Sequence, residues 1–154
     1  MNERRGDFMR LTQSCDYALR TLMYSATFSH RLVTIQEVAD QYQISKNHVM
    51  KVVYELGKHG YLESVRGRGG GFRLARPMKD INVGDVVRTM EPFELVECFG
   101  EGRCVIAPAC DLRSVLNEAM LAFLHVLDRY TIADLVANRT NELALLLGAQ
   151  KPTD

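Results

Sequence analysis

The feature that most constrains the fold of this chain is a pair of short amphipathic segments joined by a two-residue turn. Each segment is preceded by a residue whose hydroxyl can cap a helix. Thr34 precedes the segment 35–42, and Glu37 three residues later completes a capping box. Ser45 is placed to cap the segment 46–57. This second segment carries one apolar stripe at Val49, Val52, Val53 and Leu56. Two helices joined this tightly predict a helix-turn-helix.

The other face of the second segment is polar at the end that would enter a major groove. Asparagine pairs with adenine edges, and lysine pairs with guanine or with phosphate. We therefore expect DNA contacts from Ser45, Lys46, Asn47, His48 and Lys51.

Residues 58–76 read as two short alternating segments around a glycine-rich turn, which predicts a β-hairpin, the wing of a winged helix. Arginine is favoured electrostatically beside phosphates and in the minor groove. The arginines expected to contact DNA are Arg66, Arg68, Arg73 and Arg76. The glycines 67–71 lack the strand and helix that a dinucleotide-binding motif requires.

Helices are also predicted on both sides of this unit. A first helix covers residues 11–28, with Thr12 or Ser14 as its cap, and a connecting helix covers 80–91. A long amphipathic helix has apolar residues at three- and four-residue steps from Leu112 to Tyr130, and a last short helix runs through Asn138. The expected fold is mainly α with a small β wing.

The long helix needs a partner surface for its apolar face. Packing on its own domain would satisfy it, but helix-turn-helix proteins commonly bind two half-sites as dimers, which favours a homodimer. We expect a DNA-binding domain at 9–80, a connecting helix and cysteine loop at 81–111, and a dimerisation helix with a C-terminal helical segment at 112–147.

Three cysteines, Cys98, Cys104 and Cys110, follow the spacing C-x5-C-x5-C in a loop loosened by glycines and a proline. Structural zinc sites use tighter pairs of cysteines, whereas iron-sulfur clusters accept varied spacings. The loop therefore favours an iron-sulfur cluster. Of the two common types, we expect 4Fe-4S, with 2Fe-2S as the alternative. The alternative is that the three thiols bind no cofactor.

Length, cysteine usage and charge limit the class of protein. The chain has 154 residues, four cysteines and no apolar run long enough for a membrane, so we expect a reduced, cytoplasmic protein that contacts no membrane. Residues 1–80 hold 13 Lys and Arg against 8 Asp and Glu, while residues 81–154 hold 6 against 11. The basic half could bind a polyanion. No nucleophile-base pair or carboxylate dyad suggests an enzyme.

The segments 9–20, 45–48, 65–71, 98–110 and 130–136 together resemble the Rrf-type winged-helix regulators, over most of the chain from Met9 to Leu147. Within that family, the chain is most similar to the nitric-oxide-sensing repressors. Cluster-assembly regulators carry a histidine where this chain has Arg113, and iron regulators usually space the first two cysteines more widely. Both remain alternatives within the family.

The resemblance implies a homodimer on double-stranded operator DNA, with one iron-sulfur cluster per subunit held by Cys98, Cys104 and Cys110. It also implies a fourth ligand from the first helix of the other subunit, where Asp16 occupies the matching place, although Cys15 could ligate instead or be a buried helix residue. A carboxylate is a harder ligand than a thiolate, so the iron it holds should exchange most readily.

The hypothesis is that a bound cluster ties the loop to the partner's first helix and sets the spacing of the recognition helices, and that nitric oxide breaks the tie. Three other classes stay open: a cluster-free thiol switch, a zinc-stabilised DNA-binding module and an electron-transfer protein.

Overall fold

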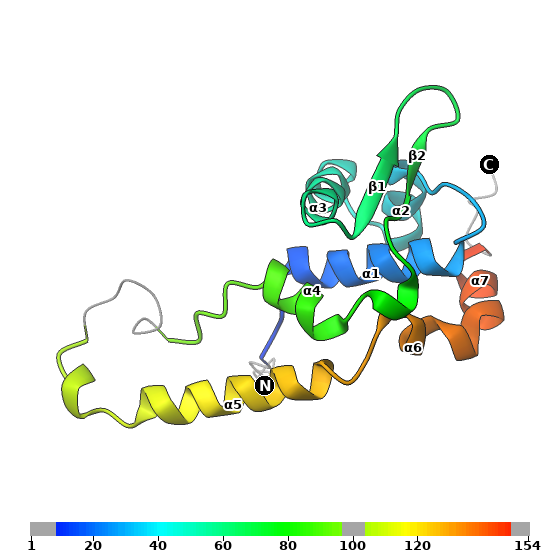
Figure 1. Cartoon of the computed structure of the whole chain (residues 1–154). Helices are drawn as coiled ribbons and strands as arrows, with labels where there is room; N and C mark the ends of the chain where they lie inside the picture. Colours follow the sequence, from blue (N-terminus) through cyan, green and yellow to red (C-terminus); the bar gives the residue numbers. More distant parts are fainter. Residues whose placement is uncertain (1–8, 97–103, 149–154) are drawn as a thin grey trace, which may run out of the picture.

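The computed structural model describes residues 9–96 and 104–148. It is mainly helical with one two-stranded sheet, which confirms the predicted fold class (Figure 1). The helices are α1 Gln13–Thr27, α2 Ile35–Tyr42, α3 Lys46–Lys58, α4 Val83–Met90, α5 Leu112–Leu127, α6 Ile132–Val136 and α7 Thr140–Gly148. The strands are β1 Leu62–Val65 and β2 Gly71–Leu74.

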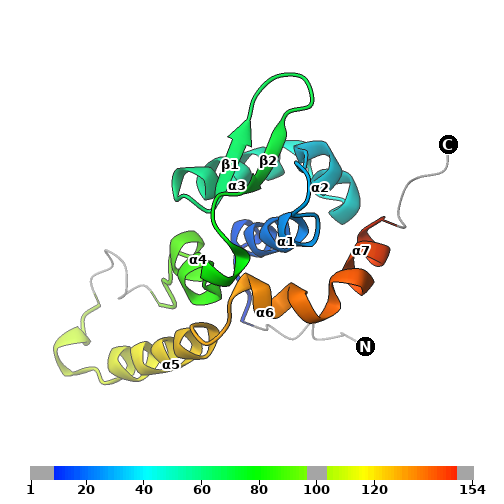
Figure 2. The same cartoon turned by 45° about the vertical axis from the view of Figure 1, so that its right-hand side comes forward.

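Helix α1 is the centre of the core. It packs against α3, α4, α6 and β2, and the turned view shows it enclosed by them (Figure 2). Its buried face includes Cys15, Ala18 and Leu22, which are spaced as one side of a helix. Of the two predicted caps, Thr12 takes the role, because its hydroxyl accepts a hydrogen bond from the Cys15 backbone N–H.

The predicted helix-turn-helix is confirmed in its local detail. The Thr34 hydroxyl accepts from the Glu37 backbone N–H, and the Glu37 carboxylate accepts from the Thr34 backbone N–H, so the capping box is complete. Helix α2 ends at Tyr42, and the C-cap residue Gln43 has a positive φ of 53°, a left-handed conformation that terminates the helix. Ser45 then caps α3 through the His48 backbone N–H.

The wing is an antiparallel hairpin in which Glu63 faces Arg73 and Ser64 faces Phe72. Phe72 is buried and also pairs with Val33, which adds a single bridge beside the hairpin. Gly71 is required by this bridge, because a Cβ atom there would lie 2.5 Å from the Val33 carbonyl oxygen.

The structure corrects three predicted helix boundaries. The connecting helix begins at Val83 rather than Asp80, because Asn82 caps it and the Ile81 carbonyl accepts from Ile132 instead of continuing a helix. The long helix ends at Leu127. The helix predicted to be the last ends at Val136, and a 3-10 turn, Ala137–Arg139, leads directly from it into α7.

Helix α5 extends away from the body of the molecule (Figures 1 and 2). Its C-terminal half packs against the core, where Leu124 is buried and Phe123 is half-buried. Its N-terminal half leaves Leu112 and Val115 more than half exposed. The described helices include none with the length and apolar character needed to cross a membrane.

Candidate nucleic-acid interface and cysteine loop

The start of α3 presents its polar side chains outward. Lys46, Asn47 and Lys51 are exposed, while Val49 and Val52 on the opposite face are buried against the core. The Ser45 hydroxyl is occupied as a helix cap, so its direct role is to fix where α3 begins. The exposed donors are therefore held on a rigid helix.

His48 lies differently from its neighbours. It is half-buried, and its ring packs edge-on against Tyr17 of α1 with 4.7 Å between ring centroids. Its Nε2 also lies 3.5 Å from the Ser14 hydroxyl. His48 therefore links the first turn of the candidate recognition helix to the first turns of α1.

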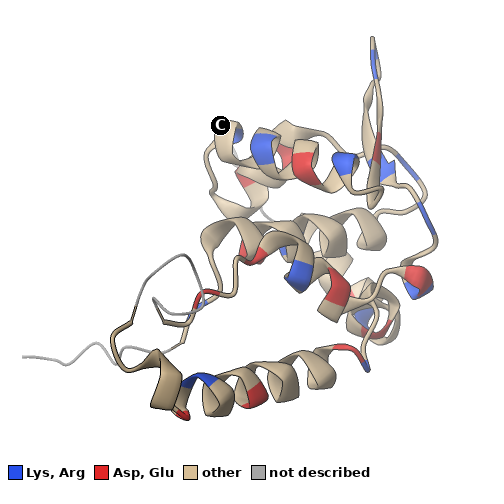
Figure 3. Cartoon of the chain, turned by 60° about the vertical axis from the view of Figure 1, so that its left-hand side comes forward, with Lys and Arg blue, Asp and Glu red and all other residues tan. Residues whose placement is uncertain are grey.

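The four wing arginines have different surroundings. Arg66 and Arg68 lie in the exposed loop between the strands, and Figure 3 shows positive charge along this upright hairpin. Arg73 forms a cross-strand ion pair with Glu63. Arg76 donates to the His59 and Gly60 carbonyls and stacks over Tyr61 at 4.7 Å, so it braces the base of the wing.

The cysteine loop is described in part. Cys104 is exposed and Cys110 is half-buried, and both are free thiols, whereas Cys98 lies outside the described residues. Thiolates are the usual protein ligands of iron-sulfur clusters, so these donors fit a cluster in kind. Within residues 9–96 and 104–148, no three candidate ligands gather at one point. The structure thus shows two available donors and leaves their grouping open.

Asp16 and Cys15 are neighbours in the first turn of α1 but differ in exposure. Asp16 is half-buried and forms an ion pair with Arg20 at 3.0 Å. Cys15 is fully buried, and burial together with the nearby Glu91 carboxylate raises the pKa of its thiol to about 12. A thiol that stays protonated is a poor metal ligand, which favours the interpretation of Cys15 as a core residue.

Glu91 is a residue that the sequence patterns did not single out. Its carboxylate accepts from the Thr12 backbone N–H at 2.8 Å and from the Thr12 hydroxyl at 2.7 Å. A carboxylate at a helix N-terminus is favourable electrostatically. Because Glu91 directly follows α4, it joins the start of the cysteine loop to the start of α1.

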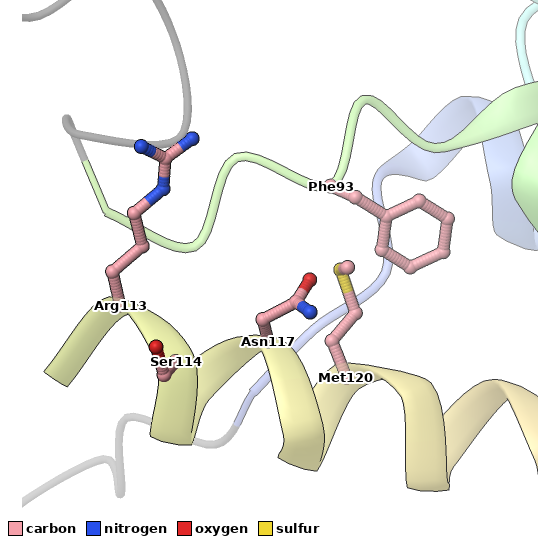
Figure 4. A pocket seen from close by; sticks show the side chains of 5 residues that line it. All are labelled: Phe93, Arg113, Ser114, Asn117 and Met120. Carbon is pink, nitrogen blue, oxygen red and sulfur yellow. The ribbon is translucent and has the colours of Figure 1, made fainter. Parts of the chain in front are cut away.

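A groove runs between the chain after α4 and the face of α5. The hollow between them has a volume of about 430 Å³. Figure 4 shows that Asn117 and Met120 rise from α5 on the side that faces Phe93. Arg113, the position at which cluster-assembly regulators are expected to carry a histidine, lines the same hollow. An adjoining and more apolar hollow of about 550 Å³ includes Leu116.

Comparisons with known proteins agree with this architecture. The family Rrf2, described as iron-dependent transcriptional regulator, matches residues 11–138. The transcriptional regulator NsrR of Bacillus subtilis is 51% identical over 142 residues, covering 90% of this chain and 97% of that protein. NsrR of Oceanobacillus iheyensis is 45% identical, covering 93% of this chain and 99% of that protein.

Among solved structures, IscR of T. potens is similar with a TM-score of 0.69 at 24% identity, covering 95% of this chain and 94% of that one. This likeness supports the fold, and the family match covers both the helix-turn-helix and the cysteine loop. The chain belongs to the Rrf2 family and is a DNA-binding transcriptional regulator rather than an enzyme.

Proposed function

We propose that this chain is a homodimeric repressor that senses nitric oxide through an iron-sulfur cluster. Residues 9–80 would bind double-stranded operator DNA, 81–111 would hold the cluster, and 112–147 would form the dimer. The observation that carries the proposal is the close similarity to NsrR proteins over almost the whole chain. The C-x5-C-x5-C spacing in the loop of this chain supports it.

The DNA-binding role draws on two adjacent surfaces. The exposed donors of α3, namely Lys46, Asn47 and Lys51, suit the major groove. The wing arginines Arg66 and Arg68 suit the phosphate backbone or the minor groove beside it. The ion pair of Arg73 and the backbone contacts of Arg76 shape the hairpin that presents them.

The cluster would be held by the thiolates of Cys98, Cys104 and Cys110, with Asp16 of the partner subunit as the fourth ligand. A 4Fe-4S cluster is favoured. When bound, the cluster supplies iron that reacts with nitric oxide. Asp16 is accessible on the α1 surface, where its ion pair with Arg20 is exposed and so can be exchanged for another partner.

The residues of the chain provide a short route from the loop to the DNA-binding face. Glu91 at the root of the loop holds the start of α1 through Thr12. One turn later, Ser14 and Tyr17 contact His48 on α3. A change in the position of α1 would therefore directly alter the contacts that hold the candidate recognition helix.

The dimer role falls to α5, which extends away from the body and leaves several large apolar side chains exposed. Its exposed apolar side chains include Leu112, Val115 and Leu121. An apolar face of this kind is buried when a second copy packs on it by two-fold symmetry.

The experiment that tests the proposal uses anaerobically purified protein, followed by visible absorbance and by operator binding during a nitric-oxide titration. We expect a brown protein whose colour and DNA affinity change together. The Cys104→Ala variant should lack the colour and the cluster-dependent binding, while Cys15→Ala serves as the matched control and keeps both.

Unchanged tight, nitric-oxide-responsive binding by Cys104→Ala would contradict the coupling. Colourless wild-type protein whose DNA binding responds to peroxide would favour a thiol switch instead. A coloured protein that responds to iron supply but not to nitric oxide would favour the iron-regulator alternative.

A further inference from the structure

Helix α3 carries two large apolar side chains in contact with solvent. Met50 is 48% exposed and Tyr54 is 68% exposed. Scattered apolar residues on a surface are ordinary. These two are neighbours, however, because residues four apart in a helix lie on the same face. They form a small apolar strip, Met50 and Tyr54, on the helix proposed to enter the major groove.

The strip continues the row of side chains that begins with Asn47. Asn47, Met50 and Tyr54 follow at steps of three and four residues, which aligns them along the outward face of α3. Asn47 is exposed at the first turn, the part of a recognition helix that reaches base edges. Met50 lies one turn further along and Tyr54 one turn beyond it.

The charge around the strip points to DNA as its occupant. Lys46 lies one turn before Met50, and Lys51 lies beside it, both exposed. Protein-protein interfaces are usually depleted in lysine at their centre, whereas DNA contacts are rich in it. The strip also lies on the same helix as the proposed base contacts and near the basic wing. In the major groove, the apolar group that a side chain between such cations can contact is the C5-methyl group of thymine.

We propose that Met50 and Tyr54 are specificity-determining residues that pack against thymine methyl groups of the operator, beside an adenine read by Asn47. This inference rests on the proposed function of α3 as the recognition helix. The strip would then make the protein prefer A·T pairs at the base positions next to the Asn47 contact.

The test uses a duplex selected by the wild-type protein from a random-sequence pool, with each thymine replaced in turn by deoxyuridine. This replacement removes one methyl group and leaves every base-pair hydrogen bond in place. At the contacted positions, wild-type binding should weaken about fourfold per methyl group, the amount expected for one buried carbon. Met50→Ala and Tyr54→Ala should bind the thymine duplex more weakly and no longer respond to deoxyuridine at their positions.

A control on the same helix separates this inference from the function it rests on. Lys51→Ala should weaken binding to all duplexes while keeping the deoxyuridine response, because Lys51 is an exposed cation beside the strip. A deoxyuridine response that persists in both apolar variants would overturn the inference and leave α3 as the reading helix. A selection that yields no preferred sequence would overturn both.

Discussion

At the scale of single residues, the capping box of α2 shows how a local motif acquires an electrostatic role. Burial raises the pKa of Glu37, but hydrogen bonds from Thr34 and the positive charge of Arg31 outweigh it, so the pKa of Glu37 is lowered. Arg31 lies 2.8 Å from the carboxylate and also stacks over Phe28. The ionised carboxylate is thus held at the entry to the helix-turn-helix.

Glu37→Gln keeps an acceptor for the Thr34 backbone N–H but removes the negative charge. It should lower the free energy of unfolding at neutral pH by about 0.3 to 1 kcal/mol, the range for a charge near a helix N-terminus. Because the folded-state pKa of Glu37 is depressed, its contribution is present above the unfolded-state pKa and is lost as pH falls through the folded-state pKa. Urea denaturation of both proteins from neutral to acidic pH should show the difference shrinking with acid. A difference that grows with acid would contradict this assignment.

Asp16 offers a second test at this scale, with its own ion-pair partner as the control. Asp16→Ala removes the proposed ligand together with the ion pair to Arg20, while Arg20→Ala removes the ion pair and keeps the carboxylate. An exposed pair of this kind contributes less than about 1 kcal/mol, so both variants should melt near the wild-type temperature.

Cluster content, measured as iron and sulfide per subunit, should fall in Asp16→Ala and stay at the wild-type level in Arg20→Ala. Equal cluster content in the two variants would move the fourth-ligand assignment away from Asp16.

At the scale of elements, a polar joint sets the angle at which α5 leaves the body. Arg88 of α4 binds both carboxylate oxygens of Asp128 at 2.6 and 2.7 Å, and the Asn82 amide donates to the Asp128 carbonyl. Their mutual hydrogen bonds raise the pKa of Arg88 and lower the pKa of Asp128. A Cβ atom at Gly84 would lie 2.0 Å from the Asp128 carboxylate, so glycine makes this approach possible.

Gly84→Ala should therefore displace Asp128 and destabilise the protein by about 1 to 3 kcal/mol, the range for overpacking. The matched control is Gly148→Ala at the end of α7, where a Cβ atom meets nothing within 4 Å. Thermal unfolding of the two variants should separate them by several degrees. Equal melting temperatures would show that the joint adapts to the added methyl group.

At the scale of the whole molecule, charge is divided between a basic first half and an acidic second half. The net charge of residues 1–80 is +5, from 13 Lys and Arg against 8 Asp and Glu. The fold places the wing with its exposed arginines at one end of the molecule and α5, which belongs to the acidic half of the chain, at the other (Figure 3). This polarity should orient the protein toward DNA before specific contacts form.

Replacing both Arg66 and Arg68 with alanine should lower the slope of log affinity against log salt by about 2, because each phosphate contact contributes about 0.9. Fluorescence anisotropy with an operator duplex between low and moderate salt measures this slope. Arg139→Ala, an exposed arginine in the acidic half, should leave it unchanged. An unchanged slope in the double variant would place the wing away from the phosphates.

Most of the DNA-binding unit could be predicted from neighbouring residues. Thr34, Glu37 and Ser45 satisfy backbone groups within three residues of themselves, so their roles are visible in the sequence. The start of α4 was misplaced because Ile81 bonds to Ile132, a partner far along the chain. Helix α7 was missed because it follows the turn Ala137–Arg139 directly and its leucines are nearly continuous.

Local capping and periodicity thus predict the winged helix from residues close together in the chain. The cysteine spacing and the motifs that resemble the family are also visible in the sequence. The contacts that connect these parts could be read only from the fold. Thr12 bonds to Glu91, 79 positions away, and Arg88 bonds to Asp128, 40 positions away. The His48 ring packs against Tyr17 of α1. No sequence period encodes such pairs, since their distance is set by the packing of α1 against α3 and α4 and of α4 against α5.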